Sequence, residues 1–247
     1  MNLLVDIGNT RIKWALHSDK GLYSYDVKVY EKHKLTELLG LCWSELPAPA
    51  NVYIANVGGN EIANELSNLL SKFWNITPTF LSADTEALGL INAYEESHLL
   101  GIDRWLAMLS AWNRAKSAFC VIDCGTAITV DVVASTGAHI GGYIIPGMAL
   151  MAGSLNSQTE QIETSLNAEL SLEFGRNTND CVGNGALTTI ISLIRHVIDE
   201  NVQEHGMDAK CIITGGSAEE IIKYLHREVI YEPYLVLDGI ALMSQNS

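Results

Sequence analysis

The chain has 247 residues, of which 48% are hydrophobic and 18% charged, and its formal net charge is −14. This composition is typical of a folded globular protein and excludes an intrinsically disordered one. The negative charge repels nucleic acid and anionic membranes, and no apolar run approaches the roughly 20 residues of a membrane span. Five cysteines without a C-x-x-C pair indicate reduced thiols. Together with an N-terminus that lacks a basic region, they favour the cytoplasm, and neither nucleic acid nor membrane is expected as a partner.

The hydrophobic pattern predicts an α/β chain whose second half begins like its first. The first half predicts strands at about 2–7, 11–17 and 22–29, a helix near 33–42, a strand at 51–55, a helix near 60–74, a strand at 78–82 and a helix at about 98–115. The second half predicts strands near 118–123, 127–133 and 138–145, a helix after Pro146-Gly147, a long helix at about 180–204, a strand at 210–214, a helix at 217–226, a strand at 229–231 and a helix at 235–244. The segment 153–179 is the least regular stretch and a candidate flap.

Two similar turns lie 117 residues apart. Asp6-Ile7-Gly8-Asn9-Thr10 and Asp123-Cys124-Gly125-Thr126-Ala127 each follow an apolar strand and lead into another. Such a turn brings backbone N–H groups, a hydroxyl and a carboxylate to one point, as a metal-bound polyphosphate requires. An Asp-x-Gly turn also joins strands in proteins where it has no further role, but its duplication favours a nucleotide site.

Three further segments carry side chains or glycines suited to phosphoryl transfer. Lys13 lies close to the first turn and could offset phosphate charge, or it is a solvated strand lysine. Gly101-Ile102-Asp103-Arg104 precedes an amphipathic helix; its carboxylate could accept a proton from an alcohol, or it only complements the helix dipole. Gly215-Gly216 lies between a strand and a helix, where a nucleoside can approach the backbone, and is otherwise an ordinary turn.

Six motifs in this order, DIGNT, GIDR, DCGTA, GGYIIPG, GRNT and ITGG, resemble those of type III pantothenate kinases over nearly the whole chain. The resemblance implies the fold of the acetate and sugar kinase, Hsp70 and actin superfamily, with two ribonuclease-H-like domains enclosing ATP in a cleft. The expected domains are 1–115, with the first phosphate loop, and 116–247, with the second phosphate loop and the adenosine motif.

The resemblance also implies an activity, which is ATP-dependent phosphorylation of pantothenate at the start of coenzyme A biosynthesis. Asp103 is the implied general base, and the implied substrate-binding residues are Tyr94, Gly101, Ile102, Asp103, Arg104 and, from the partner subunit of a homodimer, Thr178. The implied ATP-binding residues are Asp6, Ile7, Gly8, Asn9, Thr10, Arg11, Ile12, Lys13, Thr126, Gly215 and Gly216. Asp6 would hold Mg²⁺ directly or through water, and Asp123 a monovalent cation, K⁺ or NH₄⁺. Tyr94 is alternatively a simple surface aromatic residue.

Two other functions fit the same motifs. A catalytically reduced member of the family could act as a transcription-accessory or regulatory protein, although the negative charge argues against direct contact with DNA. A kinase for another small alcohol is the other alternative, because the turns alone do not select the acceptor.

Overall fold

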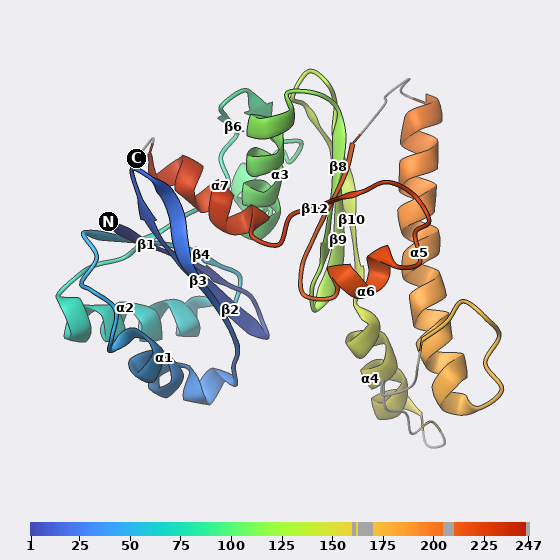
Figure 1. Ribbon diagram of the computed structural model, residues 1–247, viewed down its shortest axis with the longest axis horizontal. Helices are drawn as coiled ribbons and strands as arrows, with labels where there is room; N and C mark the ends of the chain where they lie inside the picture. The colour runs from blue at the N-terminus through green and yellow to red at the C-terminus, as the bar shows by residue number, and fades with distance from the viewer. Residues whose placement is uncertain (160–161, 163–169, 205–209, 246–247) are drawn as a thin grey trace. The chain divides into compact units, whose positions relative to one another are not determined.

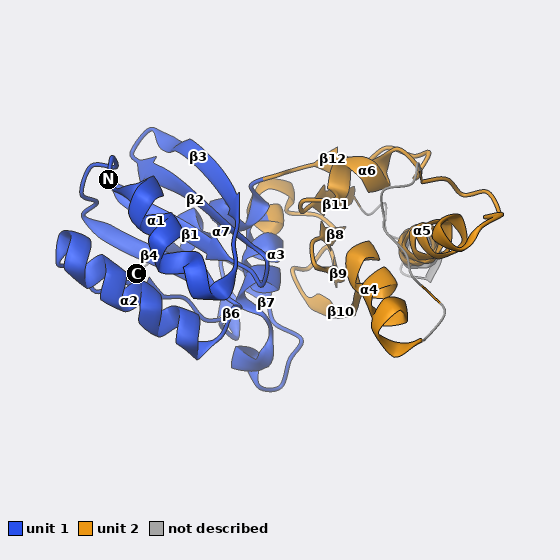
Figure 2. Ribbon diagram, turned by 90° about the horizontal axis from the view of Figure 1, so that it is seen from below, with its two compact units in different colours: residues 1–110, 234–247 blue, residues 111–233 orange. Residues whose placement is uncertain are grey.

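The computed structural model describes residues 1–159, 162, 170–204 and 210–245. The chain forms two compact units, residues 1–110 with 234–247 and residues 111–233 (Figure 2). Relative to the expected domains 1–115 and 116–247, the last helix joins the first unit, because it packs on the first sheet. Residues 111–115, the end of a helix that begins in unit 1, join unit 2.

The sheet of unit 1 has five strands in the order β3-β2-β1-β4-β5. Its strands are β1 (Asn2–Ile7), β2 (Arg11–Ser18), β3 (Gly21–Val29), β4 (Asn51–Asn56) and β5 (Thr79–Phe80). Strand β1 pairs antiparallel with β2 and parallel with β4. Helices α1 (Leu35–Trp43) and α2 (Asn60–Trp74) lie on one face of this sheet, and α7 (Leu235–Ser244) packs on β1, β2 and β4 (Figure 1).

The side chains of β1 alternate between the two faces of the sheet, which explains which of them are buried in the core and why Asp6 is partly exposed. Leu3, Val5 and Ile7 enter the core shared with residues of α1 and α2. Leu4 is also fully buried, and because successive side chains alternate between faces, it and Asp6 belong to the other face. Asp6, near the end of the strand, is partly exposed. The sheet therefore presents the Asp6 carboxylate at the carboxyl edge of β1.

The sheet of unit 2 repeats this topology, with the order β10-β9-β8-β11-β12. Its strands are β8 (Phe119–Cys124), β9 (Ala127–Val133), β10 (His139–Pro146), β11 (Lys210–Thr214) and β12 (Ile230–Tyr231). Strand β8 is antiparallel to β9 and parallel to β11, as β1 is to β2 and β4. The helices of this unit are α4 (Met148–Gln158), α5 (Thr178–Glu204) and α6 (Ala218–Ile222). The sequence repeat is thus a repeat of strand order as well.

Helix α5 supplies much of the core of unit 2. Ile190, Ile194 and Ile198 recur at helical spacing and are buried against the apolar residues of β8 and β9. The stretch Thr178–Asp199 is long and apolar enough to cross a membrane by length and composition, and half of it is buried. A core helix passes the same test.

The remaining elements include the places where the expected pattern was wrong. Helix α3 runs over Ile102–Ala115 rather than from about 98, because Ser97–Leu99 forms a 3-10 turn and Leu100 is extended. Helix α6 ends at Ile222, not 226. A short hairpin, β6 (Glu86–Ala87) with β7 (Leu90–Ile91), was not expected, and a 3-10 turn at Lys32–Lys34 precedes α1. Of the candidate flap at 153–179, residues 160–161 and 163–169 lie outside the described part.

Candidate active site

The first Asp-Gly turn joins β1 to β2 and is held by three backbone carbonyl contacts. The Gly8 N–H donates to the Arg11 carbonyl over 3.0 Å, which closes the turn. The Tyr30 N–H donates to the Thr10 carbonyl over 3.1 Å, and the Tyr30 hydroxyl donates to the Gly8 carbonyl over 2.6 Å. Tyr30 is buried, and this burial raises the pKa of its phenol. Tyr30 therefore fixes the loop in place.

The side chains of this turn divide between solvent and core. Asn9, Thr10 and Arg11 are exposed, and Asp6, Gly8 and Lys13 are partly exposed. Ile7 and Ile12 are fully buried in the core of unit 1, so any contact they make with ATP must come from the backbone. Gly8 needs no positive φ, and a Cβ there would meet only the Arg11 carbonyl at 3.5 Å. The turn geometry therefore does not require glycine at position 8. The missing side chain instead leaves open space beside the backbone.

The second turn joins β8 to β9 and is one residue shorter. The Gly125 N–H donates to the Ala127 carbonyl over 3.1 Å. The Gly147 N–H, directly after β10, donates to the Thr126 carbonyl over 2.9 Å, as the Tyr30 N–H after β3 does to Thr10. A Cβ on Gly147 would lie 2.7 Å from the Thr126 carbonyl oxygen, so only glycine fits there. Thr126 is exposed and Asp123 partly exposed.

Gly215 and Gly216 follow β11 and lie next to the second turn in the chain fold. They make the segment between the strand and the donor to this turn two residues longer than in unit 1. The Ser217 N–H donates to the Cys124 carbonyl over 2.9 Å, whereas in unit 1 Val57, directly after β4, donates to the corresponding Ile7 carbonyl. Gly215 has φ +96°, and a Cβ there would overlap Asp123 Oδ1 and lie 2.5 Å from the Cys124 nitrogen. Gly215 is partly exposed and Gly216 exposed. The Asp123 carboxylate therefore lies directly over the Gly215 backbone.

The GIDR motif forms the N-terminus of α3. The Trp105 N–H donates to the Gly101 carbonyl over 3.1 Å, which makes Gly101 the cap, and Asp103 lies in the first turn. Asp103 Oδ1 accepts the Arg104 N–H over 2.8 Å, and a Cβ on Gly101 would lie 2.7 Å from this oxygen. Asp103 is partly exposed, where the helix N-terminus favours its negative charge. The Ile102 side chain is buried, which leaves its backbone for any ligand contact.

Arg104 and Tyr94 come together although ten residues separate them. The Arg104 side chain is buried, and its Nη1 donates to the Tyr94 hydroxyl over 3.0 Å. The guanidinium carbon lies 5.8 Å from the centre of the Tyr94 ring. A buried guanidinium is stable only when its donors are satisfied. Tyr94, which is exposed, is therefore more than an isolated surface aromatic residue.

Asn92 positions Tyr94, and sequence reasoning missed it. Its side chain is buried, accepts the Tyr94 N–H over 2.9 Å and donates to the carbonyls of Asp84 and Ser97 over 3.1 and 3.3 Å. These bonds fasten the loop that carries Tyr94 to both of its ends. An asparagine among polar loop residues gives no sign of this in sequence.

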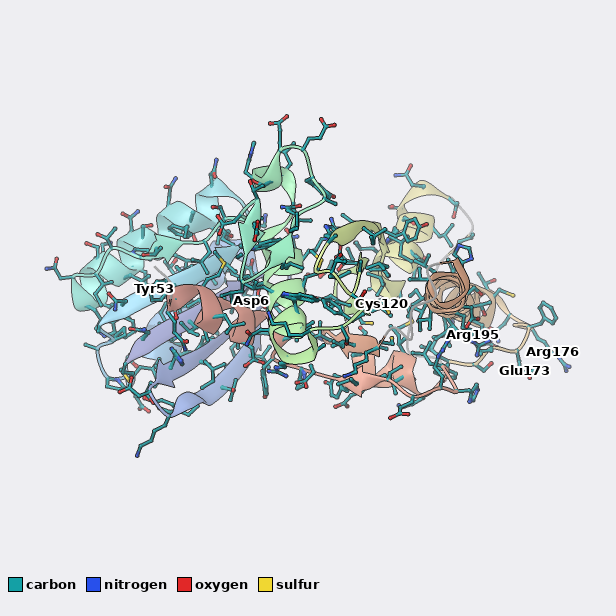
Figure 3. All side chains as sticks on the ribbon, turned by 90° about the horizontal axis from the view of Figure 1, so that it is seen from above. Asp6, Tyr53, Cys120, Glu173, Arg176 and Arg195 are labelled. Atoms are coloured by element: carbon teal, nitrogen blue, oxygen red, sulfur yellow. The ribbon has the colours of Figure 1, made fainter. Side chains whose placement is uncertain are left out.

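Thr178 is the first residue of α5 and is exposed. The preceding Asn177 caps the helix: its Oδ1 accepts the Asp180 N–H over 3.0 Å, and its Nδ2 donates to the Asp180 carboxylate over 2.7 Å. Figure 3 shows Glu173 and Arg176 on the loop before this helix, and Phe174 between them is 99% exposed. An exposed apolar side chain thus precedes Thr178 by four residues in the sequence.

The described residues provide neither a reactive cysteine nucleophile nor a metal site built from several protein side chains. All five cysteines are free, and burial, with the Asp123 charge next, raises the pKa of the Cys124 thiol, which makes it a poor nucleophile. Cys120, Cys124 and Cys211 are buried, whereas Cys181 is exposed. Among the residues that the structure describes, no three His, Cys, Asp or Glu side chains form a metal cluster. Any cation must therefore take further oxygens from hydroxyls, backbone, water or substrate.

Comparison with known proteins gives consistent matches. A family model described as type III pantothenate kinase matches residues 2–200. A type III pantothenate kinase of Nitrosococcus oceani is 38% identical over 253 aligned residues, which cover all of this chain and 95% of that protein. A structure described as a conserved putative Baf family transcriptional activator from Campylobacter jejuni superposes with a TM-score of 0.60 at 24% identity, over 99% of this chain and 98% of that chain.

A putative 2-dehydro-3-deoxygalactonokinase from Sinorhizobium meliloti also superposes with a TM-score of 0.60, at 10% identity, over 100% of this chain and 99% of that chain. Likeness at such identities bears on the fold alone. With the two five-stranded sheets of identical order, it confirms the expected actin-like ATPase fold.

Proposed function

The chain belongs to the type III pantothenate kinase family, and we propose that it transfers the γ-phosphoryl group of ATP to the terminal hydroxyl of pantothenate. The product, 4'-phosphopantothenate, starts coenzyme A biosynthesis. The observation that carries this proposal is the arrangement at the start of α3. There a partly exposed carboxylate, Asp103, adjoins a buried guanidinium, Arg104, that is tied to Tyr94.

Asp103 acts as the general base in this proposal. Its carboxylate orients the incoming hydroxyl and accepts its proton as the phosphoryl group moves. Arg104, Tyr94 and the backbone of Gly101 and Ile102 hold pantothenate in line, which is the main requirement of phosphoryl transfer. Because Asp103 Oδ1 is fixed by the Arg104 N–H, the base is oriented before substrate arrives.

The two Asp-Gly turns bind ATP in this proposal. The residues from Asp6 to Lys13 form the first phosphate loop, in which Gly8 leaves open space and Lys13 offsets the developing charge. Thr126 contacts the phosphates from the second loop, and Gly215 with Gly216 accommodates the adenosine.

The cations fit the carboxylates at the two turns. Mg²⁺ commonly takes one or two protein carboxylates and completes its shell with phosphates and water, which suits the single, partly exposed Asp6. Asp123 suits a monovalent cation, K⁺ or NH₄⁺, because a buried hydroxyl without a hydrogen-bond partner, that of Thr214, lies on the strand beside it. Bound there, these cations would neutralise phosphate charge.

We further propose that the protein is a homodimer in the cytoplasm, with Thr178 reaching the pantothenate bound by the partner subunit. Phe174, 99% exposed four residues before Thr178, is the side chain proposed to be covered at this interface, because covering a phenylalanine removes a large apolar area from water. The free cysteines suit a reducing compartment. Phe174→Asp is expected to convert a dimer to a monomer in light scattering, whereas Leu41→Asp, at a side chain 72% exposed on α1, is not. A dimer that survives Phe174→Asp would contradict this interface.

One coupled assay tests the function. Purified protein with Mg²⁺, K⁺ and ATP should release ADP with pantothenate and not with a panel of sugars and short hydroxy acids. Asp103→Asn should keep its fold, because the amide oxygen still accepts the Arg104 N–H. Its kcat should be about 10²–10⁴-fold lower than that of the wild type. Glu95→Gln, which removes an exposed charge near Tyr94, serves as the matched control and should retain activity. An Asp103→Asn enzyme of near-normal kcat would refute the base.

The structural relative described as a transcriptional activator keeps a second candidate open, an accessory protein with reduced catalysis. Absence of ADP release with every acceptor would favour it. Turnover with a different acceptor would instead favour a kinase for another small alcohol.

A further inference from the structure

Thr214 carries a hydroxyl that the fold buries and leaves unsatisfied. It is the last residue of β11 and is 1% exposed, and among the residues that the structure describes its Oγ1 has no hydrogen-bond partner. Burying a hydroxyl without a partner is unfavourable, because the group loses its hydrogen bonds to water and gains none in return. Such an atom in a native structure requires a reason, which is commonly a bound water or ion.

The position of Thr214 in the sheet identifies what this hydroxyl adjoins. Thr214 and Asp123 are register partners in the parallel β8–β11 ladder, and partners in register project from the same face. The next residue, Gly215, has φ +96° and cannot carry a Cβ, because the Asp123 carboxylate fills that space. The orphan hydroxyl and the carboxylate thus share one side of the sheet edge.

The internal repeat supplies a comparison within the same chain. In unit 1, Asp6 lies between Ala55 of β4 and Lys13 of β2. In unit 2, Asp123 lies between Thr214 of β11 and Thr129 of β9. The lysine that is the register partner of Asp6 is therefore replaced by a threonine, Thr129, as the partner of Asp123, and Ala55 is replaced by Thr214.

We propose that Thr214 Oγ1 is a second protein ligand of the monovalent cation at Asp123, and that this cation supplies in the second repeat the positive charge that Lys13 carries in the first. The inference rests on the proposed function and adds a ligand to it. One carboxylate and one neutral hydroxyl suit a weakly hydrated monovalent ion, since hard cations bind oxygen and neutral oxygen dipoles select K⁺. Among the described residues no cluster of three or more His, Cys, Asp or Glu side chains lies at Asp123, so the further protein ligands there are neutral oxygens.

The test measures cation binding without pantothenate. The melting temperature of the protein with ADP and Mg²⁺ is titrated with KCl against choline chloride at constant ionic strength, because a ligand of the native state raises it by mass action. Loss of one ligand worth about 1.4 kcal/mol is a tenfold change in affinity. Thr214→Val should therefore raise the half-saturating K⁺ concentration about tenfold, whereas Thr214→Ser, which keeps the hydroxyl, should stay within about threefold of wild type.

Ser110→Ala is the matched control, because Ser110 on α3 also buries a hydroxyl without a partner but lies outside the sheet of Asp123. It should leave the K⁺ response unchanged. The proposal is overturned if Thr214→Val matches wild type, if Thr214→Ser behaves like Thr214→Val, or if wild type shows no K⁺ dependence.

Crystals of the wild-type protein grown with Rb⁺ or Tl⁺ provide a measurement that needs no variant. An anomalous peak contacting both Thr214 Oγ1 and Asp123 supports the proposal, and a peak at Asp123 without contact to Thr214 overturns it. Because neither measurement uses pantothenate, loss of pantothenate turnover would count against the proposed function and leave this ligand assignment standing.

Discussion

Gly215→Ala is the substitution for which the structure gives the most definite magnitude. Alanine at a positive φ costs about 1–2 kcal/mol, and Gly215 has φ +96°. The new Cβ would also lie 2.5 Å from the nitrogen and 2.6 Å from the carbonyl carbon of Cys124, which are backbone atoms and cannot turn away. Overpacking of this kind costs about 1–3 kcal/mol.

One effect opposes this loss. Alanine lowers the conformational entropy of the unfolded chain and so stabilises by about 0.4–1 kcal/mol where the backbone accepts it. The strain exceeds this gain, and the expected net destabilisation is about 2–4 kcal/mol. Because the same Cβ meets the Asp123 carboxylate, the variant should also weaken the K⁺ response.

Denaturant unfolding at fixed K⁺ measures this difference. Gly185→Ala is the matched control, because Gly185 is exposed in the middle of α5 and its Cβ would meet nothing within 4 Å. There the same substitution should stabilise by about 0.5–1 kcal/mol. If Gly215→Ala were as stable as wild type, the close approach of β11 to the second turn would be wrong.

Three further substitutions test residues that position the site. Tyr30→Phe removes the bond to the Gly8 carbonyl and should cost about 1 kcal/mol. Because the folded state raises the pKa of Tyr30, its stabilisation is complete below about pH 10 and falls as pH rises through the folded pKa, so the difference from wild type should shrink in unfolding titrations at alkaline pH; a constant difference would contradict this. Asn92→Ala strands the Tyr94 N–H and two carbonyls, and should cost about 1–3 kcal/mol and raise the KM for pantothenate more than that for ATP. Asn177→Ala should cost about 1 kcal/mol in thermal unfolding and Asn177→Ser much less, because a serine hydroxyl still accepts the Asp180 N–H and adds no charge beside the Asp180 carboxylate; equal losses would exclude the cap.

Much of the fold could be predicted because the strands alternate or run apolar over five or more residues. The strands β1, β2 and β3 recur as β8, β9 and β10, so each half supported the interpretation of the other. Strands β6 and β7 could not be predicted, since two residues each carry no periodicity. The start of α3 was misplaced because Leu99 and Leu100 extend its apolar pattern backwards, although the backbone there is not α-helical.

The candidate site was predictable only where the chemistry lies within one motif. Asp103 and Arg104 are adjacent, and so are Gly215 and Gly216, whereas Tyr30 acts on Gly8 from 22 residues away. Thr214 could not be identified as a candidate ligand from a motif, because its role depends on the register of β8 with β11 and on the burial of its hydroxyl, which only the structure shows.

The two turns share one backbone hydrogen bond but differ in the side chains around them. In each, the residue directly after the third strand, Tyr30 or Gly147, donates its N–H to the carbonyl at the tip of the turn, Thr10 or Thr126. Tyr30 adds a second bond through its hydroxyl, whereas Gly147 fits only because it has no side chain. Since the backbone bond is the same, the difference between the turns must come from the neighbouring strands. There one repeat pairs a lysine with its aspartate and the other pairs threonines with its aspartate. Under the cation proposal, a fixed positive charge in the first repeat corresponds to a bound ion in the second.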